Sequence, residues 1–493
     1  ELNRVQEINS ELEQLYQREF AALSELFGED GDLPDSWRAS IRAVTSRPSA
    51  DVAPDTPLPQ PDVVPVSHQE RQRIQRAVRD LFGFDQLLPG QAETMAAVLR
   101  KQDVLTILPT GGGKSLCYQI PALIDRAGTT LVISPLIALM KDQVDSLPPV
   151  ARQRATTINS SLDGRELGHR MRDVANGRYQ LVYAAPERLR QPPFLHALRR
   201  CKVNRLVVDE AHCVSVWGHD FRPDYLTIDQ ARCTLGDPPL LAMTATAPPR
   251  VRRDILQRLG KRVEVSDGKS EMIVVATDVH RANLNLAAVR VRNADEKLQR
   301  LLGLCKTEEG SGIIYAGTRA RCEQIASLLA SRGISAAHYH AGIPDRAAVQ
   351  DAFMHGEIRV VVATIAFGMG VDKADIRFII HLQLPDSLEA YYQEVGRAGR
   401  DGLPARCTLI YTIADRGTLT RRSRKDALST QFLRSVYTAI RKRLGEAMLG
   451  SVAKDDLARD VQADETKVRV ALSVLEQAGL LHRHQDTPRT AVA

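Results

Sequence analysis

Short runs of β-branched and aliphatic residues alternate with helical stretches along most of this chain, and this alternation restricts the fold strongly. The first set of runs is at residues 104–108, 130–133 and 206–208, and the second set is at residues 312–315, 358–362 and 378–380. Runs that are apolar throughout are typical of strands buried on both faces of a parallel sheet. The pattern therefore predicts two successive α/β domains, each with helices covering a parallel sheet.

The remaining segments differ from these two domains. Residues 1–45 have apolar residues close to heptad spacing, which fits a coiled coil or partner helix, or equally an amphipathic helix on the protein's own surface. Residues 46–66 hold six prolines and are predicted to be an extended linker. The predicted division is 1–45, 46–66, 67–275, 276–415, a linker at 416–430, and 431–493.

The last segment has its own pattern. Helical stretches at 431–444, 455–461 and 465–478 end in a glycine and a short apolar run. Asp464 can cap the third stretch, whose apolar stripe has helical spacing and comprises Val468, Ala471, Leu472 and Leu475. Helix, turn, helix and strand are the outline of a winged helix, although an ordinary small helical domain fits the same pattern.

Charge and cysteine usage narrow the class of protein. Residues 416–493 carry 15 Lys and Arg against nine Asp and Glu, so this segment holds a net charge of +6. Such a surface could bind phosphates, although a solvated charged face is the ordinary alternative. The seven cysteines are scattered, so we expect no zinc and reduced thiols. We find neither a long apolar run nor a secretory leader, and expect a cytoplasmic protein, nucleoid-associated if bacterial, with no membrane partner.

A glycine-rich loop follows the first predicted strand. It comprises Thr110, Gly111, Gly112, Gly113, Lys114 and Ser115. Glycines let backbone N–H groups close around phosphate oxygens at the positive end of the following helix. Lys114 would neutralise the β- and γ-phosphates, and the Ser115 hydroxyl would bind Mg²⁺. The generic pattern requires glycine at position 108, where this chain has Leu, and the alternative is a glycine turn without a ligand.

Two acids follow the strand at 206–208. Asp209 would bind Mg²⁺ through its water shell, and Glu210 would act as a general base, with His212 close behind them. Adjacent acids also occur at ordinary helix starts. In the second domain, Arg397 and Arg400 would share one helix face and could stabilise charge that develops on a γ-phosphate. A basic helix that faces solvent is the alternative.

Together these residues resemble the RecQ-type DNA helicases, over residues 67–415. The loop has the T-G-G-G-K-S form of superfamily-two helicases. Further matching stretches are 134–143, 185–189, 243–247, 340–342 and 363–373. The resemblance implies two tandem RecA-like parallel-sheet domains followed by a small winged-helix-like domain. It also implies ATP as a ligand. Ser134, Pro135 and Thr364 would then contact nucleic acid, and Gly370 and Asp372 would contact the nucleotide.

Residues 215–225 resemble the aromatic loop that distinguishes RecQ-type enzymes and couples DNA binding to hydrolysis in that family. Trp217 and Phe221 could stack on unpaired bases, while His219 and Arg222 relay to phosphate. Taken alone, Trp and Phe are more often core residues.

Two departures from the family pattern stand out. Gln91 can pair with the adenine edge, but the family's stacking Arg is Leu88 here. The four-Cys zinc module is absent from the chain, because no cysteine follows Cys407.

The resemblance implies an ATP-dependent DNA helicase that moves 3′ to 5′ on single-stranded and tailed duplex DNA. It also implies a role in repair or recombination. An RNA helicase is one alternative, because an Asp-Glu-Ala-His sequence marks many of those as well. A nucleotide-switched DNA-binding protein that does not unwind DNA is the other.

Overall fold

The computed structural model describes residues 61–125, 128–135, 137–160, 162–215, 221–260, 272–278, 281–365, 367, 373–415, 417–419, 429–445, 450–477 and 480–483. The chain divides into two compact units. Residues 59–422 form one unit, and the described residues from 429 onward belong to the other. The expected N-terminal helical segment, 1–45, lies outside the described residues, as does most of the expected linker.

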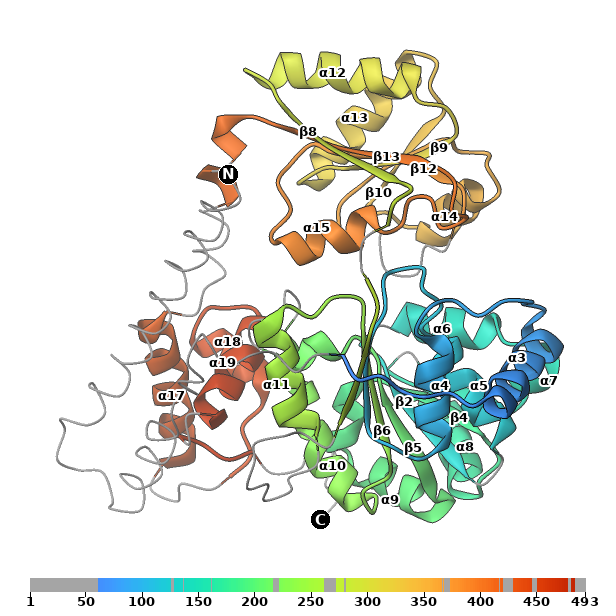
Figure 1. Cartoon of the computed structure of the whole chain (residues 1–493). Helices are drawn as coiled ribbons and strands as arrows, with labels where there is room; N and C mark the ends of the chain where they lie inside the picture. The colour runs from blue at the N-terminus through green and yellow to red at the C-terminus, as the bar shows by residue number, and fades with distance from the viewer. Residues whose placement is uncertain are drawn as a thin grey trace. The chain divides into compact units, whose positions relative to one another are not determined.

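The first half of the larger unit is built on a seven-stranded sheet, in the order β3-β4-β2-β5-β6-β1-β7. Strands β2, β4, β5 and β6 of this sheet are labelled in Figure 1. Every strand pair in it is parallel. The strands are β1 (Val104–Ile107), β2 (Thr129–Ile133), β3 (Ala155–Ile158), β4 (Leu181–Ala184), β5 (Val203–Val208), β6 (Leu240–Thr244) and β7 (Ile273–Ala276).

Helices cover both faces of this sheet because each strand is apolar on both sides. Leu105 and Ile107 pack in one core with residues of α8 to α11, whereas Val104 and Leu108 pack in a second core with residues of α4 to α7. The helices are α3 (His68–Phe82), α4 (Gln91–Leu99), α5 (Leu116–Ile124), α6 (Ile137–Asp145), α7 (Pro149–Arg152), α8 (Gly164–Ala175), α9 (Pro192–Cys201), α10 (Ile228–Thr234) and α11 (Pro249–Leu259). Three short 3-10 helices join them: η1 (Pro186–Arg190), η2 (Ala211–Val214) and η3 (Pro223–Thr227).

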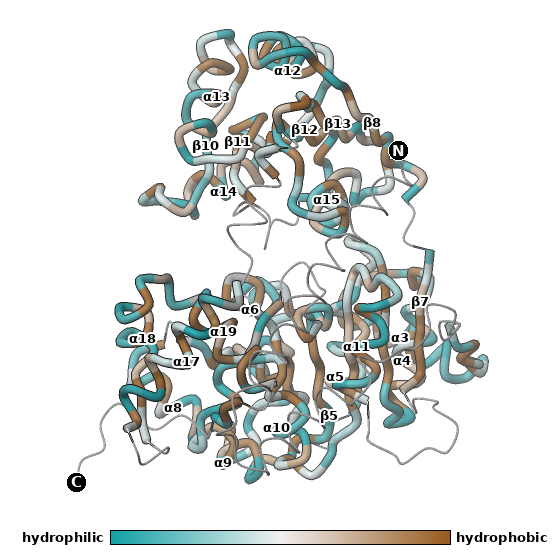
Figure 2. Tube along the Cα trace, turned by 90° about the vertical axis from the view of Figure 1, so that its left-hand side faces the viewer, coloured by the Kyte–Doolittle hydropathy of each residue, from teal (hydrophilic) through white to brown (hydrophobic). Residues whose placement is uncertain are grey.

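The second half of the unit repeats this plan with six parallel strands, in the order β10-β11-β9-β12-β13-β8. Figure 2 shows hydrophobic residues concentrated along the strands of both sheets. The strands are β8 (Leu284–Arg290), β9 (Ser311–Tyr315), β10 (Ala336–Tyr339), β11 (Val360–Ala363), β12 (Ile376–His381) and β13 (Ala405–Tyr411). The helices are α12 (Ala294–Thr307), α13 (Arg319–Ser331), α14 (Arg346–Met354) and α15 (Leu388–Val395).

The prediction of two α/β domains with parallel sheets is confirmed. Each of the six predicted apolar runs overlaps a strand, and the largest boundary difference is at the run predicted for 206–208, because β5 begins three residues earlier, at Val203. The end of the expected linker is held against the first sheet. The backbone N–H of Asp62 donates to the Val274 carbonyl at 2.8 Å, and the Asp62 carboxylate accepts from the Val274 N–H at 2.7 Å.

The smaller unit contains α17 (Thr430–Leu444), α18 (Lys454–Asp460) and α19 (Glu465–Gln477). The stripe predicted for the third helix is buried and packs with Leu433 and Val436 of α17. Asp464 caps that helix as predicted, because its Oδ1 accepts from the Lys467 N–H at 2.8 Å. No strand is present in the short described segment after α19, 480–483, so the winged helix stays a prediction.

Within the described part of the chain, no helix is both long enough and apolar enough to cross a membrane.

Candidate nucleotide and nucleic-acid site

The glycine-rich loop joins β1 to α5, as the sequence predicts, and its shape depends on its glycines. Gly111 and Gly113 have left-handed φ angles of +81° and +64°. A Cβ on Gly112 would lie 2.9 Å from the Pro109 carbonyl oxygen, and one on Gly113 would lie 2.4 Å from Nε2 of Gln91. Any larger residue would therefore be strained or would collide. The loop precedes the positive N-terminal end of α5, which favours an anion.

Gln91 braces this loop from the start of α4. Its Nε2 donates to the carbonyls of Gly112 and Gly113, at 3.2 Å each, while its Oε1 accepts from the Leu88 N–H at 2.9 Å. The Lys114 ammonium donates to the Leu108 carbonyl at 3.3 Å. The amide group of Gln91 is thus engaged with the loop, and its expected pairing with a base stays a prediction.

The two acids stand at the end of β5, on the same edge of the sheet as the loop, because all the strands are parallel. Burial and the neighbouring Glu210 carboxylate raise the pKa of Asp209 to about 7, and the Lys114 ammonium opposes this shift. A carboxylate with a raised pKa beside a cationic side chain fits a site that a divalent cation completes.

Glu210 is held in a strained conformation. Its φ of 47° and ψ of 50° are left-handed, a conformation that costs a residue with a Cβ about 1–2 kcal/mol. Its Oε2 is buried and accepts no hydrogen bond from the described residues, although Nδ1 of His212 lies 3.4 Å away. An unsatisfied buried carboxylate oxygen is costly, so its position suits an acid that contacts a ligand or a water molecule.

His212 connects this acid loop to the end of β6. Its Nδ1 lies 3.0 Å from Oγ1 of Thr244, and that hydroxyl donates to the Thr246 carbonyl at 2.9 Å. Strand β6 lies between β5 and β1, so three consecutive strand ends carry the acids, Thr244 and the glycine loop.

Arg397 and Arg400 do not lie on a helix, which corrects the expectation that they share a helix face. Helix α15 ends at Val395, and turns follow through residue 400. Gly399 has a left-handed φ of +55°, and its N–H donates to the Ile376 carbonyl at 2.9 Å. The chain therefore bends back toward β12 instead of continuing the helix.

This turn lies against the glycine loop. A Cβ on Gly111 would lie 3.5 Å from Cγ of Arg400, and one on Gly396 would lie 2.9 Å from Cβ of Thr110. Nε of Arg397 is buried and donates to no described residue. Two positively charged side chains therefore belong to a turn that reaches a phosphate-type loop of the other sheet.

The sequence did not single out the residues that hold this turn. Arg281 donates to the carbonyls of Gly396, at 2.8 Å, and Gly399, and Asn283 donates to the Gly399 carbonyl at 2.8 Å. In the sequence, these are simply two polar residues shortly before β8. Nothing in the neighbouring residues indicates that their hydrogen-bond partners lie more than 110 positions away.

The candidate nucleic-acid residues are placed in part. NH1 of Arg222 donates to the Pro135 carbonyl at 2.8 Å, so the structure brings together two loops that the sequence assigned to nucleic acid. Ser134 is buried, Phe221 is half-buried, and the Thr364 N–H donates to the Tyr339 carbonyl at 3.3 Å. Trp217, His219, Gly370 and Asp372 lie outside the described residues.

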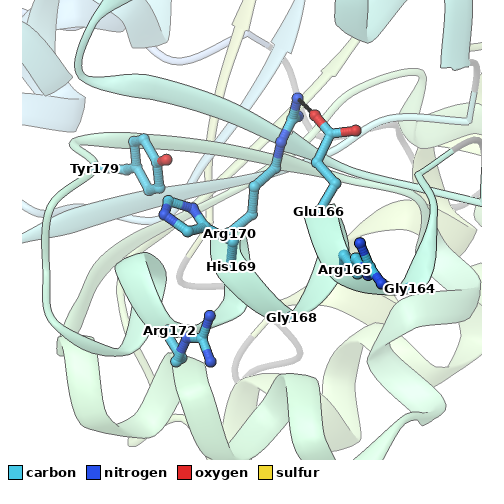
Figure 3. A pocket seen from close by; sticks show the side chains of 8 residues that line it. All are labelled: Gly164, Arg165, Glu166, Gly168, His169, Arg170, Arg172 and Tyr179. Carbon is cyan, nitrogen blue, oxygen red and sulfur yellow. Dashed lines mark hydrogen bonds and ion pairs between the residues drawn. The ribbon is translucent and has the colours of Figure 1, made fainter.

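Two hollows lie away from this site. One is on α8 and carries several basic residues (Figure 3), but Glu166 pairs with Arg170, and Asp173 lies 3.2 Å from Arg178 and 3.6 Å from His169. These pairs reduce its attraction for an anion. The other lies at the carboxyl ends of β9, β12 and β13, where Lys297 is bound to Asp415 at 2.7 Å.

Comparison with known proteins agrees with this geometry. The family model "DEAD/DEAH box helicase" matches residues 88–255, and "Helicase conserved C-terminal domain" matches residues 293–402. The chain is 42% identical over 347 residues to ATP-dependent DNA helicase RecQ of Bacillus subtilis, covering 70% of this chain and 57% of that protein. It is 42% identical to ATP-dependent DNA helicase Q5 of Mus musculus, covering 73% of this chain and 38% of that protein.

Solved structures show the same fold at lower identity. Helicase Lhr of Mycobacterium smegmatis aligns with a TM-score of 0.54 and 21% identity, over 82% of this chain and 55% of that one. Helicase MrfA aligns with a TM-score of 0.56 and 19% identity, over 74% of this chain and 54% of that one. The chain thus spans little more than half the length of most of these relatives. Probable ATP-dependent DNA helicase RecS of Bacillus subtilis, however, is 40% identical, and the match covers 70% of this chain and 68% of RecS. This chain therefore belongs to the RecQ-like family of superfamily-two helicases.

Proposed function

We propose that this chain is an ATP-dependent DNA helicase that moves 3′ to 5′ on single-stranded DNA and unwinds duplex DNA during repair or recombination. The observation that carries the proposal is the approach of the 396–400 turn to the glycine loop, because one triphosphate could then contact both sheets. The curated relatives support the substrate, since RecQ and RecS are both named DNA helicases. The polarity and the role in repair follow from the family resemblance.

ATP would bind with its β- and γ-phosphates against the backbone N–H groups of residues 111–114 and the Lys114 ammonium. Ser115 and Asp209 would hold Mg²⁺, and the ion would supply positive charge that offsets the phosphate charge. Glu210 would orient the attacking water and accept its proton. Arg397 and Arg400 would stabilise the charge that develops on the transferred phosphoryl group.

Hydrolysis would be coupled to DNA through the loops near Pro135 and Arg222. The hydrogen bond between these residues joins the predicted aromatic loop to the loop after β2. The Arg222 N–H also donates to the Cys213 carbonyl at 3.0 Å, so a strand bound there would change the position of the acids through residues 209–215. Stacking on Trp217 and Phe221 would be largely independent of which base is bound. Phosphate contacts at Ser134 and Thr364 would likewise not distinguish one base from another.

The cycle that we propose uses ATP and Mg²⁺ but no cysteine-bound zinc, because no two cysteines have metal-ligand spacing in the sequence. Among the described residues, no cysteine belongs to a group of three or more potential metal ligands. We further propose a cytoplasmic or nucleoid-associated location, where DNA and ATP are both available. Residues 1–45 stay a candidate partner or self-association segment.

A strand-displacement assay on 3′-tailed and 5′-tailed duplexes tests the proposal. We expect ATP-dependent displacement from the 3′-tailed substrate, its loss in Lys114→Ala, and its retention in Lys306→Ala, which removes an exposed lysine from α12. ATPase stimulation is measured with DNA and RNA strands of one sequence. Stronger stimulation by RNA would support an RNA helicase. Stable duplex binding with no displacement would support a nucleotide-switched DNA-binding protein.

A further inference from the structure

Two histidines stand side by side at the end of β10, in the second sheet. His338 is in the strand and His340 directly follows it. Residues two apart in a strand direct their side chains to the same face. The two rings accordingly stack, with centroids 5.3 Å apart and an interplanar angle of 18°. His340 is buried and His338 is half-buried, so the pair lies at the boundary between the protein interior and solvent.

An acid from the neighbouring helix completes a group of three. Glu323 is on α13, which packs against β10, and its Oε1 lies 3.0 Å from Nε2 of His340. One ligand atom from each of Glu323, His338 and His340 lies within 4.8 Å of the other two. It is the one cluster of at least three His, Cys, Asp or Glu side chains with such spacing in the described part of the chain.

We propose that Glu323, His338 and His340 bind a divalent transition-metal ion of the Zn²⁺ class. Two imidazoles and one carboxylate are a ligand set that binds Zn²⁺ with a fourth position left for water. A hard ion such as Mg²⁺ prefers oxygen ligands, so this site would discriminate against the cation of the nucleotide site. The proposal departs from the sequence-based expectation of no zinc, which considered cysteine ligands alone. It does not depend on the proposed helicase activity.

The pair of His340 and Glu323 could by itself be an ordinary structural hydrogen bond. His338 makes the difference, because its ring forms no hydrogen bond with another described residue and yet stacks on that pair. A polar ring held beside a carboxylate without a partner of its own retains a free lone pair for a metal ion.

The hydrogen bonds of His340 determine what metal binding must displace. Its Nδ1 accepts from the Gly342 N–H at 3.2 Å, so Nε2 carries the proton and donates to Glu323. An ion bound at Nε2 would replace that proton, and the neutral ring would then carry its proton on Nδ1. The Nδ1–H would face the N–H of Gly342, and two donors cannot hydrogen-bond to each other. The Gly342 hydrogen bond would have to open. Metal binding is therefore coupled to the turn at 341–343, next to Tyr339, whose carbonyl accepts from Thr364.

Titration of the metal-free full chain with Co²⁺, followed by visible absorption, tests the site. The titration uses a Cys233→Ser background, because Cys233 is the exposed thiol among the cysteines. We expect one equivalent of Co²⁺ to bind saturably, with the absorption of a four- or five-coordinate site, and to be displaced by Zn²⁺. Loss of a residue that only supports a metal ligand weakens binding about 10- to 100-fold, so we expect losses of roughly 100-fold or more in His338→Ala and Glu323→Gln.

His355→Ala is the matched control, because it removes an exposed imidazole at the end of α14, outside the cluster. It should bind Co²⁺ as the parent does. Thermal melting without metal shows whether each variant is folded, and the exposed Glu323→Gln decides the question if His338→Ala is not. The proposal is wrong if no single-equivalent site exists, or if a folded His338→Ala or Glu323→Gln variant binds Co²⁺ with the parent's affinity.

Discussion

Nδ1 of His212 lies 3.0 Å from Oγ1 of Thr244, although the two residues are 32 positions apart. The contact joins the loop that carries both acids to the end of β6. It is completed by the Thr244 hydroxyl, which donates to the Thr246 carbonyl at 2.9 Å. A change at either end of this chain of hydrogen bonds would therefore move the imidazole that lies beside Glu210.

Thr244→Val tests this contact, because valine keeps the shape of threonine and removes the hydroxyl. Loss of a buried hydrogen-bond partner costs about 1–3 kcal/mol, so we expect a lower free energy of unfolding in denaturant titration. We also expect DNA-stimulated ATP turnover to fall by roughly tenfold with little change in the KM for ATP. A misplaced His212 that raises the activation free energy by about 1.4 kcal/mol slows the reaction by a factor of ten. Thr246→Val is the stability control, because Oγ1 of Thr246 is buried and donates to no described residue. Equal destabilisation by both variants would contradict the role of the contact.

Gly113→Ala tests the packing of the phosphate loop. The added Cβ would lie 2.4 Å from Nε2 of Gln91, at a residue whose φ is +64°. We expect ATP binding, measured with a fluorescent ATP analogue, to weaken by at least about tenfold, because the loop must shift by enough to lose backbone contacts with phosphate. Gly177→Ala is the control, because Gly177 has a φ of +69° but nothing lies within 4 Å of its added Cβ. It introduces the same kind of backbone strain without a collision, and ATP binding should stay at the parent's level. Normal ATP binding by Gly113→Ala would show that the loop does not need this glycine.

The raised pKa of Asp209 predicts a pH dependence for the metal. Burial and Glu210 raise this pKa to about 7, and the carboxyl group must lose its proton before it can hold a cation. Apparent Mg²⁺ affinity should therefore fall by roughly tenfold per pH unit as the pH drops below 7, in ATPase titrations between about pH 6 and 8. Asp209→Asn should bind Mg²⁺ weakly at every pH, without this slope.

The same shift has a consequence for the metal-free protein. Because the folded-state pKa lies above the ordinary value of 3.8, ionisation of Asp209 opposes folding. Its contribution to stability is present at low pH and is lost as the pH rises through about 7. The difference in unfolding free energy between Asp209→Asn and the parent should therefore shift in favour of the variant between about pH 4 and 7 and level off above that range. A pH-independent difference would mean that Asp209 has an ordinary pKa.

Trp217→Ala tests the aromatic loop. If the indole stacks on an unpaired base, its loss removes about 1–3 kcal/mol of base stacking and should reduce stimulation of the ATPase by single-stranded DNA. ATP turnover without DNA should stay at the parent's level. Trp37→Ala, which removes the other tryptophan of the chain, is the control. Unchanged DNA stimulation in Trp217→Ala would exclude the coupling role that the resemblance assigns to that residue.

Local sequence determined much of this protein. Apolar runs predicted the strands because a strand buried on both faces needs hydrophobic residues at consecutive positions, and β1, β5 and β9 lie where the runs are. The glycines at 111 and 113 predicted a loop because only glycine adopts left-handed φ without strain. The sequence also placed Asp209 and Glu210 directly after a predicted strand, and because parallel strands end on the same side, they lie at the same edge of the sheet as the glycine loop.

Only the tertiary structure decided the partners that are distant in the chain. The Gly399 turn redirected Arg397 and Arg400 from the predicted helix, and Arg281 holds that turn from more than 110 residues away. The hydrogen bond of His212 to Thr244 and the grouping of Glu323 with His338 and His340 likewise depend on how strands and helices pack. Periodicity and motifs describe neighbours along the chain, whereas these contacts are set by strand order and by the crossovers between strands, which no local pattern encodes.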